Sequence, residues 1–259
     1  MKKLTLLATT LAILLVAHVQ ICDAAAPAPA NPGGGFKNLY HDMKVINFPE
    51  EVTKIDTNLQ KEALLFSPKE KPEGKIPLIV MLHGAGGTKK KDVRAFEVNR
   101  DVRWAMTAAN KKYVAKILVP RSTSHWNPAA MNKAVEYILS TNDDIDPSRI
   151  YCCGYSLGGL GTWNWARHKP NPLAAVVPVA FIASQENIDN LKDLPVWAMA
   201  GTNDRRRAGS VKSLEKVFKD KGFKNNRVTI FEGANHGQTA ALAWKEKGLL
   251  EWLFSHSKK

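Results

Sequence analysis

Cysteine is scarce in this chain, because only Cys22, Cys152 and Cys153 occur among its 259 residues. Three cysteines exclude a disulfide framework and a metal site built from cysteine ligands. Cys152 and Cys153 are neighbours in an apolar run, which is typical of small residues in a hydrophobic core. The length suffices for one α/β domain with a large core.

Other features are missing as well. The sequence has no internal repeat, no recognisable nucleic-acid-binding motif, and no apolar run beyond residue 35 that is long enough to span a bilayer. We therefore expect no nucleic-acid partner. Apolar residues make up 44% of the chain and charged residues 24%, which is the composition of a soluble globular protein.

The N-terminus has the pattern of a secretory signal peptide over residues 1–26. Lys2 and Lys3 supply positive charge, the following residues are nearly all apolar or small, and the small residues at 24–26 offer a cleavage site. Retention of the apolar stretch as a membrane anchor is the alternative. Lipidation of Cys22 is a weaker one, because the bulky Ile21 precedes it.

A flexible linker rich in Pro and Gly is expected at 27–35, and the folded domain at 36–259. With the signal peptide removed, we expect a secreted or periplasmic protein without stable membrane insertion.

Apolar runs alternate with segments of helical periodicity, which predicts a mostly parallel sheet covered by helices on both faces. Short β-like pieces at 45–65 would form an antiparallel edge. Strands are expected at 76–82, 115–119, 174–179, 196–200 and 228–231, with a further strand entering from 150. Helices are expected at 92–110, 128–140, 160–169, 207–221 and 239–254.

Residues 154–158 read Gly-Tyr-Ser-Leu-Gly between a predicted strand and a predicted helix. This is the layout of a nucleophile elbow, in which a sharp turn projects Ser156 from the edge of the sheet. Gly154 and Gly158 flank the serine, because a Cβ at either position would crowd the turn. Ser156 is therefore the candidate nucleophile.

A serine hydroxyl needs a general base, which in this type of fold follows it in the sequence. Of the three histidines after Ser156, His168 ends the predicted elbow helix and His256 lies in the C-terminal tail. His236 instead follows the last predicted strand in a glycine-rich loop, so it is the candidate base.

The base needs an orienting acid between Ser156 and His236. Asp204 comes directly after an apolar strand, whereas Asp189 and Asp193 precede that strand and would lie at the wrong edge. Asp204 is therefore the candidate acid.

An oxyanion needs two N–H donors that are already in place. Leu157, which follows the nucleophile, should supply one of them. Ala85 in the segment His83-Gly84-Ala85-Gly86-Gly87 should supply the other, with Gly86 as the neighbouring option. We expect His83 to brace this loop rather than to transfer protons.

The chain resembles the α/β-hydrolase superfamily, and within it the polyhydroxybutyrate-depolymerase-like, feruloyl and acetylxylan esterases. The resemblance spans roughly residue 78 to the C-terminus, and it rests on LHGAGG at 82–87, DPSRIY at 146–151, GYSLGG at 154–159, GTND at 201–204 and NHG at 235–237. It implies a three-layer α/β sandwich without a large lid, in which a secreted serine esterase forms an acyl-enzyme on Ser156, Asp204 and His236 without a metal or cofactor.

The sequence also offers candidate residues for substrate binding. Trp126 and Gly86 are candidate substrate contacts, although Trp126 could equally be a packed tryptophan. The net charge of +13 and the basic runs at 89–91 and 205–207 fit either a polymeric or acidic ester substrate or a solvated surface. Two other functions stay open: a prolyl-oligopeptidase-like serine peptidase, and a non-catalytic envelope-binding protein on the same fold.

Overall fold

The computed structural model describes residues 41–70, 72–97, 99–108 and 112–258. The predicted signal peptide, the linker and the domain start at Phe36 lie outside these ranges. No helix in the described part of the chain is long and apolar enough to cross a bilayer.

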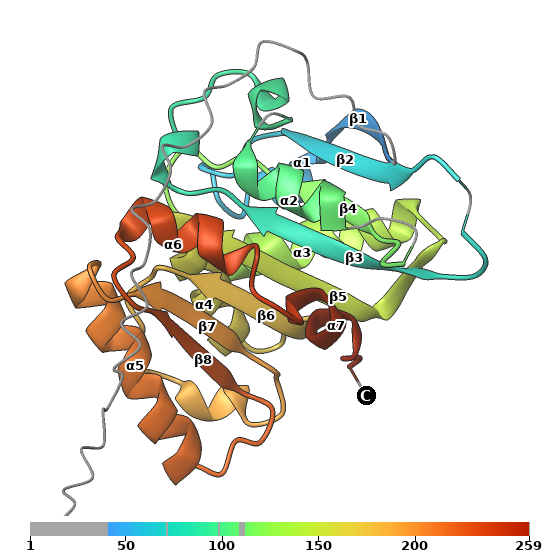
Figure 1. Cartoon of the computed structure of the whole chain (residues 1–259). Coiled ribbons are helices and arrows are strands. Elements are labelled where there is room, and N and C mark those ends of the chain that lie inside the picture. Colours follow the sequence, from blue (N-terminus) through green and yellow to red (C-terminus); the bar gives the residue numbers. More distant parts are fainter. Residues whose placement is uncertain (1–40, 71, 98, 109–111, 259) are drawn as a thin grey trace, which may run out of the picture. The chain divides into compact units, whose positions relative to one another are not determined.

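Within the described ranges, eight strands form one sheet in the order β1-β2-β4-β3-β5-β6-β7-β8 (Figure 1). The first two pairings, β1 with β2 and β2 with β4, are antiparallel, and all others are parallel. The strands are β1 His41–Asn47, β2 Glu62–Pro68, β3 Ile76–Leu82, β4 Lys116–Val119, β5 Ile145–Tyr155, β6 Leu173–Val179, β7 Trp197–Gly201 and β8 Arg227–Phe231.

Helices cover both faces of this sheet, which confirms the predicted three-layer α/β sandwich. Helices α1, α3, α4 and α5 contribute to the large core on one face, and Figure 1 shows α2, α6 and α7 on the other. Their bounds are α1 Glu50–Thr53, η1 Ala85–Gly87, η2 Val93–Phe96, α2 Arg100–Ala108, α3 Pro128–Thr141, α4 Leu157–Arg167, η3 Ile188–Leu191, α5 Arg205–Asp220, α6 His236–Ala243 and α7 Leu249–Phe254.

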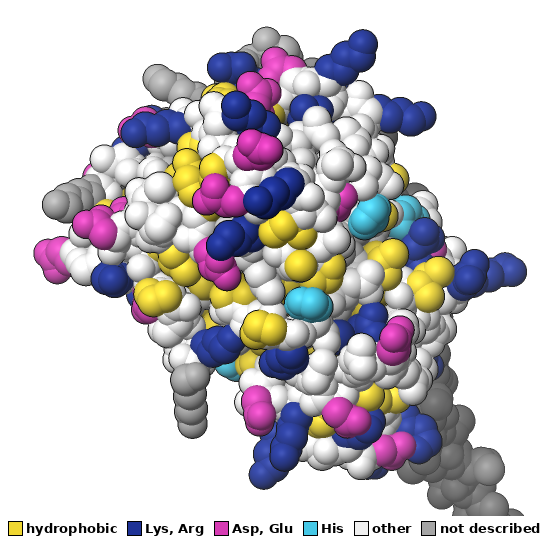
Figure 2. Space-filling model, turned by 180° about the vertical axis from the view of Figure 1, so that it is seen from behind, with side chains coloured by type: hydrophobic (Ala, Val, Ile, Leu, Met, Phe, Trp, Pro, Cys, Tyr) yellow, Lys and Arg dark blue, Asp and Glu magenta, His cyan; other side chains and the backbone are white. Residues whose placement is uncertain are grey.

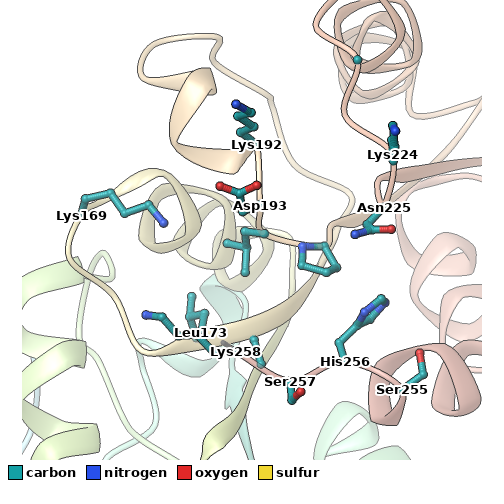
Figure 3. A pocket seen from close by; sticks show the side chains of 14 residues that line it. Lys169, Leu173, Lys192, Asp193, Lys224, Asn225, Ser255, His256, Ser257 and Lys258 are labelled. Atoms are coloured by element: carbon teal, nitrogen blue, oxygen red, sulfur yellow. The ribbon is translucent and has the colours of Figure 1, made fainter.

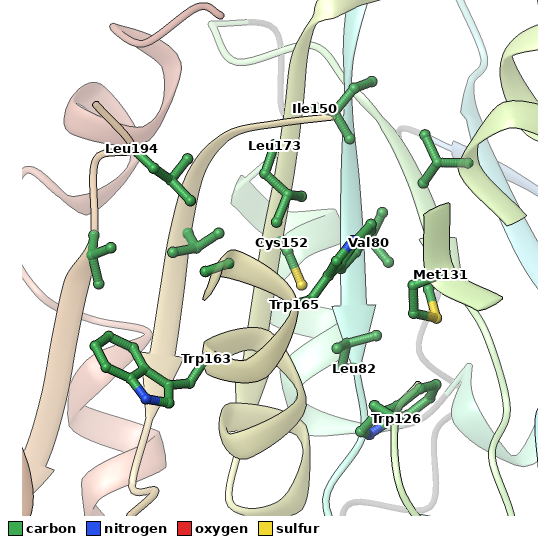
Figure 4. Close-up of a cluster of buried hydrophobic side chains, with 14 of the residues drawn as sticks. Val80, Leu82, Trp126, Met131, Ile150, Cys152, Trp163, Trp165, Leu173 and Leu194 are labelled. Carbon is green, nitrogen blue, oxygen red and sulfur yellow. The ribbon is translucent and has the colours of Figure 1, made fainter. Parts of the chain in front are cut away.

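The central strands are apolar because both of their faces are covered. All seven residues of β3 and all seven of β6 are buried. Trp163 and Trp165 of α4 are at most 1% exposed, and Figure 4 shows Trp165 beside Val80 and Cys152 of the sheet. Burying an aliphatic side chain such as that of Val80 stabilises the fold by about 1.5–3 kcal/mol. This rigid layer positions the strand ends that carry the candidate site.

The predicted helix at 92–110 is wrong in one respect, because the structure divides it into η2 and α2. A side chain caps the N-terminus of each of these two helices. The Asp92 carboxylate accepts the Arg94 N–H at 2.8 Å, and the Asn99 side-chain oxygen accepts the Asp101 N–H at 2.8 Å. Such caps compete with a continuous helix by satisfying the first N–H groups of each segment.

The predicted helix at 239–254 is also divided, into α6 and α7. Gly248 adopts φ 78°, a left-handed conformation that interrupts the helix just before α7. At the other end, α6 begins at His236, because Asn235 and Gln238 form a reciprocal capping box. This earlier start places the candidate base in the first turn of a helix.

No large lid covers the sheet edge in the described structure. The connection between β6 and β7, where the sequence has its longest gap between strands, contains the short η3 as its one helix. The carboxyl ends of β5, β7 and β8 therefore meet at an edge without an inserted domain.

Candidate active site

Ser156 lies on the turn between β5 and α4, in a conformation that few residues other than glycine adopt. Its φ of 59° and ψ of −115° are a strained combination for a residue with a side chain. The turn is tight, because a Cβ at Gly158 would lie 1.9 Å from the Leu82 carbonyl oxygen, and one at Gly154 would lie 2.3 Å from the Gly158 carbonyl oxygen. The strand, the strained serine and the helix together have the geometry of a nucleophile elbow.

The structure brings Ser156, His236 and Asp204 together from three separate strand ends. Ser156 Oγ lies 3.0 Å from His236 Nε2, and His236 Nδ1 lies 2.5 Å from Asp204 Oδ2. The Asp204 side chain is 9% exposed and that of His236 is 36% exposed. The acid is thus shielded while the base reaches the surface, so the serine can be deprotonated where a substrate has access.

Hydrogen bonds between the loops after β7 and β8 fix the acid relative to the base. The Asn203 N–H donates to the Ala234 carbonyl at 3.0 Å, and the Asn203 side chain donates to the Gly233 carbonyl at 2.7 Å. The Gly233 N–H donates to Thr202 Oγ1 at 2.7 Å. Because these bonds join the two loops directly, Asp204 and His236 are held within hydrogen-bonding distance.

Arg207, the last residue of the basic run at 205–207, binds the other oxygen of the acid. Its Nη1 lies 2.9 Å from Asp204 Oδ1, and its side chain is 35% exposed. Asp204 is the N-cap residue of α5, but its side chain makes no capping bond to the helix. Both carboxylate oxygens are instead used by side chains, one by Arg207 and one by His236. The three-residue spacing at a helix start was the available sequence signal.

Tyr155 and Arg100 are further neighbours that sequence reasoning missed. The Tyr155 hydroxyl donates to the His236 carbonyl oxygen at 2.9 Å, and the two rings lie 4.9 Å apart. The Arg100 guanidinium lies 5.6 Å from the Tyr155 ring centroid and donates to the Gly237 carbonyl at 3.4 Å. Burial raises the pKa of Tyr155, so its hydroxyl stays protonated as a donor. These contacts span up to 137 residues, and no local pattern signals them.

Leu157 and Ala85 each occupy the first position of a helix, α4 and η1 respectively. At that position a backbone N–H has no acceptor within its own helix. The loop that carries Ala85 reaches the nucleophile, because a Cβ at Gly84 would lie 3.5 Å from Ser156 Cβ. Ala85 and Gly86 are both exposed. The arrangement leaves both N–H groups available to an oxyanion beside Ser156.

His83 supports this loop from below, as expected from the sequence. It is 4% exposed, its Nδ1–H donates to the Gly84 carbonyl at 2.9 Å, and its Nε2 accepts the Ser122 N–H at 3.0 Å. Its ring stacks on Phe96 with centroids 4.7 Å apart. Burial lowers the pKa of His83 to about 4, so the ring is neutral at ordinary pH. Both nitrogens are occupied, which leaves none for proton transfer to a substrate.

The expectation that Trp126 contacts substrate is wrong. Its side chain is 4% exposed and lies in the hydrophobic core shown in Figure 4. The indole N–H donates to the His83 carbonyl at 3.2 Å, and a Cβ at Gly161 would lie 2.5 Å from the indole ring. Trp126 therefore packs between the loop and α4. Gly86, the other candidate contact, is exposed with open space around its Cα.

The described residues contain no group of three or more His, Cys, Asp or Glu side chains placed to hold a metal ion. Cys152 and Cys153 are free and buried, and burial raises the pKa of Cys152 to about 12. Neither thiol lies at the sheet edge that carries Ser156. The nucleophile available at this edge is the serine hydroxyl.

Comparison with protein families gives a match to the dienelactone hydrolase family over residues 98–244. This chain belongs to the dienelactone hydrolase family. The matched segment includes Ser156, Asp204 and His236, and the family is one of hydrolases with the α/β-hydrolase fold. The polyhydroxybutyrate-depolymerase-like subgroup expected from the motifs is not distinguished by this match. No curated protein gives a significant match to the chain.

Solved structures similar to this chain are also α/β-hydrolases. A thermostable esterase is 24% identical, with a TM-score of 0.66 over 84% of this chain and 63% of its own. An acylaminoacyl peptidase from Pyrococcus horikoshii is 17% identical, with a TM-score of 0.61 over 86% of this chain and 43% of its own. S-formylglutathione hydrolase from Staphylococcus aureus is 13% identical, with a TM-score of 0.54 over 83% of this chain and 97% of its own. The chain thus spans less than two thirds of the esterase and less than half of the peptidase.

Proposed function

We propose that this protein hydrolyses carboxylic esters through an acyl-enzyme on Ser156. The observation that carries the proposal is the chain of contacts from Ser156 Oγ to His236 Nε2 at 3.0 Å and from His236 Nδ1 to Asp204 at 2.5 Å. A serine outside such a chain is a poor nucleophile, and the strained elbow exposes this one.

The reaction proceeds in two steps. Ser156 Oγ forms a bond to the ester carbonyl carbon while His236 Nε2 takes its proton. The C–O bond to the alcohol then breaks, and His236 returns the proton to the departing alcohol. Water attacks the acyl-enzyme in the same way, which releases the acid and restores Ser156. The N–H groups of Leu157 and Ala85 stabilise the oxyanion in both steps.

The substrate is a short-chain, polysaccharide-linked or polyester ester, and an acidic one is favoured by local charge. Arg205 and Arg206 are exposed in the first turn of α5, directly after Asp204. Exposed cations beside the site raise the local concentration of anionic substrates, and salt screens this effect. The absence of a lid in the described structure suits a polymeric substrate. Replacing both arginines with glutamine should raise KM for an acidic ester, but not for a neutral one.

A serine peptidase is the second candidate, and one observation favours it. The fold resembles that of the acylaminoacyl peptidase, although this chain covers 43% of that protein. The chemistry differs only in the leaving group, which is an amine rather than an alcohol. A non-catalytic envelope-binding role is the third candidate, and the hydrogen-bonded triad argues against it.

Two assays separate these functions. The purified protein should release p-nitrophenol from p-nitrophenyl acetate, and the Ser156→Ala variant should not. Peptide p-nitroanilides should be turned over far more slowly. Faster cleavage of the anilides would establish the peptidase, and equal background rates for wild type and variant on both substrates would establish a non-catalytic protein.

The location of this activity is also part of the proposal. The pattern of residues 1–26 supports export to the periplasm or the medium. Fractionation of cells that produce the full chain, followed by mass determination of the mature N-terminus, tests this. A chain that retains residues 1–26 in the membrane fraction would show that the segment is an anchor.

A further inference from the structure

A pocket of about 800 Å³ lies at the opposite edge of the sheet from Ser156 (Figure 3). Its walls include Leu173 at the start of β6, Pro195 just before β7, and Asn225 just before β8. The triad residues instead follow the carboxyl ends of β5, β7 and β8. Since β6 spans seven residues at about 3.3 Å each, the two sites are about 20 Å apart. The volume is in the range of small-molecule binding sites.

The pocket is strongly basic. Four lysines from four different segments line it, and Asp193 is the one acidic residue among its lining side chains. The lysines are Lys169 after α4, Lys192 after η3, Lys224 after α5 and Lys258 after α7. Long-range folding has therefore gathered positive charge that is dispersed in the sequence.

These lysines are not neutralised within the described residues, unlike several others on the surface. On the face shown in Figure 2 basic and acidic side chains are interspersed. Lys133 of α3, for example, pairs with Glu136 at 2.9 Å. Lys221 precedes Gly222, which lines the pocket, and it pairs with Asp189 at 2.6 Å. By contrast, no carboxylate of a described residue forms an ion pair with Lys169, Lys192 or Lys224.

Lys258 is fixed in the wall of the pocket. Its backbone N–H donates to the Ser148 carbonyl at 2.7 Å, and its ammonium group donates to the Asn171 carbonyl. Burial and the neighbouring charge of Lys169 lower the pKa of Lys258. Both residues line the same pocket, so an anion bound there would relieve the repulsion between their like charges.

We propose that this pocket is a second binding site, separate from the triad, for a small anion that carries two or more carboxylate or phosphate groups. The apolar side chains of Leu173, Leu194 and Pro195 provide contact area, and the lysines select by charge. A ligand with several negative groups is required because one exposed ion pair changes affinity by a factor of only about two to five. This inference does not depend on the proposed esterase activity.

Calorimetric titration at 0.15 M salt with citrate and, separately, with pyrophosphate tests the proposal. We expect saturable binding of at least one of them with a dissociation constant below about 1 mM. Tighter binding of citrate would identify a carboxylate site, and tighter binding of pyrophosphate a phosphate site. Failure of both to saturate, at a salt concentration where screening acts beyond about 8 Å, would overturn the proposal.

A matched pair of variants locates the binding. The triple variant Lys169→Gln, Lys192→Gln, Lys224→Gln should weaken it by about tenfold or more. The control Lys44→Gln, Lys54→Gln, Lys61→Gln removes the same charge from exposed positions around β1 and β2, at the far end of the sheet. It should change the dissociation constant by less than about twofold. Equal weakening in both variants would show that net charge alone attracts the anion, and would refute a site.

A fourth variant makes the result independent of any loss of folding. Asp193→Asn removes the one acidic side chain of the pocket, so it should tighten anion binding by about two- to fivefold. A damaged protein would not bind more tightly. Unchanged or weaker binding in this variant would contradict the proposed position of the anion.

Discussion

The two edges of the central sheet use charge in opposite ways. At the carboxyl edge, Asp204 is 9% exposed and each of its oxygens contacts a cationic or proton-donating partner, Arg207 or His236. At the amino edge, Lys169, Lys192 and Lys224 are exposed and unpaired within the described structure. Charge that is paired inside the protein orients other groups, whereas charge that faces solvent is available to an external ion. The same fold thus carries a candidate reaction centre at one edge and a candidate anion site at the other.

The largest effect should come from the triad. His236→Ala should lower kcat on p-nitrophenyl acetate by about 10⁴- to 10⁶-fold, because the serine then has no base. Calorimetric binding of the anion at the amino edge should be unchanged in the same variant. Loss of both properties together would show that the two edges are not independent. If His83→Ala abolished turnover and His236→Ala did not, the assignment of the base would be wrong.

The tight backbone of the elbow should dominate stability at the carboxyl edge. Gly158→Ala forces a methyl group to within 1.9 Å of the Leu82 carbonyl oxygen, so the free energy of unfolding should fall by about 3 kcal/mol or more. Gly209→Ala is the matched control, because Gly209 lies in α5 with open space around it. That change should stabilise the protein by about 0.5–1 kcal/mol. Urea denaturation measures both, and equal effects would contradict the crowding at the elbow.

The histidine beneath the carboxyl edge should make stability depend on pH. Because folding lowers the pKa of His83 from 6.5 to about 4, its contribution is present above pH 6.5 and is lost as pH falls toward 4. The loss is about 3 kcal/mol in the free energy of unfolding. His83→Gln, which keeps an acceptor for the Ser122 N–H, should remove this part of the pH dependence. Denaturant titrations at pH 7, 5 and 4 measure the free energy of unfolding of both proteins. The same dependence of this free energy on pH in wild type and variant would contradict the role of His83.

Arg207 should act as a positioning residue for the acid. Arg207→Gln leaves one oxygen of Asp204 without its charged partner, so kcat should fall by about tenfold with little change in KM. Arg207→Lys should restore part of the loss. Arg205→Gln, which removes an exposed arginine from the same helical turn, is the control and should leave kcat on a neutral ester unchanged. A change in KM alone would place Arg207 at the substrate rather than at the acid.

The smallest effect should follow from changes at the amino edge. The variant with Lys169, Lys192 and Lys224 replaced by glutamine should hydrolyse a neutral ester at the wild-type rate, because about 20 Å separates the two sites and salt screens exposed charges beyond about 8 Å. Steady-state kinetics at 0.15 M salt measures this. A marked fall in kcat would indicate coupling between the two edges.

Much of the fold and the triad could be predicted from the sequence. The buried strand β3 has the bounds that its apolar run predicts, 76–82. Ser156, Asp204 and His236 were found because each follows an apolar strand, and the carboxyl ends of parallel strands share one edge. The mutual distances within the triad could not be predicted, since they depend on bonds between loops such as that of Asn203 to Gly233.

The remaining differences have local or long-range causes. The caps Asp92 and Asn99 divide the predicted helix at 92–110. Hydrophobic periodicity does not reveal such side-chain hydrogen bonds. Trp126 is a candidate substrate contact in the sequence because it follows a strand end, yet Gly161 leaves room for its ring in the core. The basic pocket could not be predicted from the sequence, because its four lysines are spread over 90 positions between 169 and 258.

Covalent labelling shows whether Ser156 is the nucleophile. A fluorophosphonate reacts with a serine that is activated by a base, and mass spectrometry of the digested protein locates the adduct. We expect one labelled residue, Ser156, with labelling abolished in His236→Ala. An adduct on another serine, or an active enzyme with no adduct at all, would contradict the assignment of Ser156 as the nucleophile.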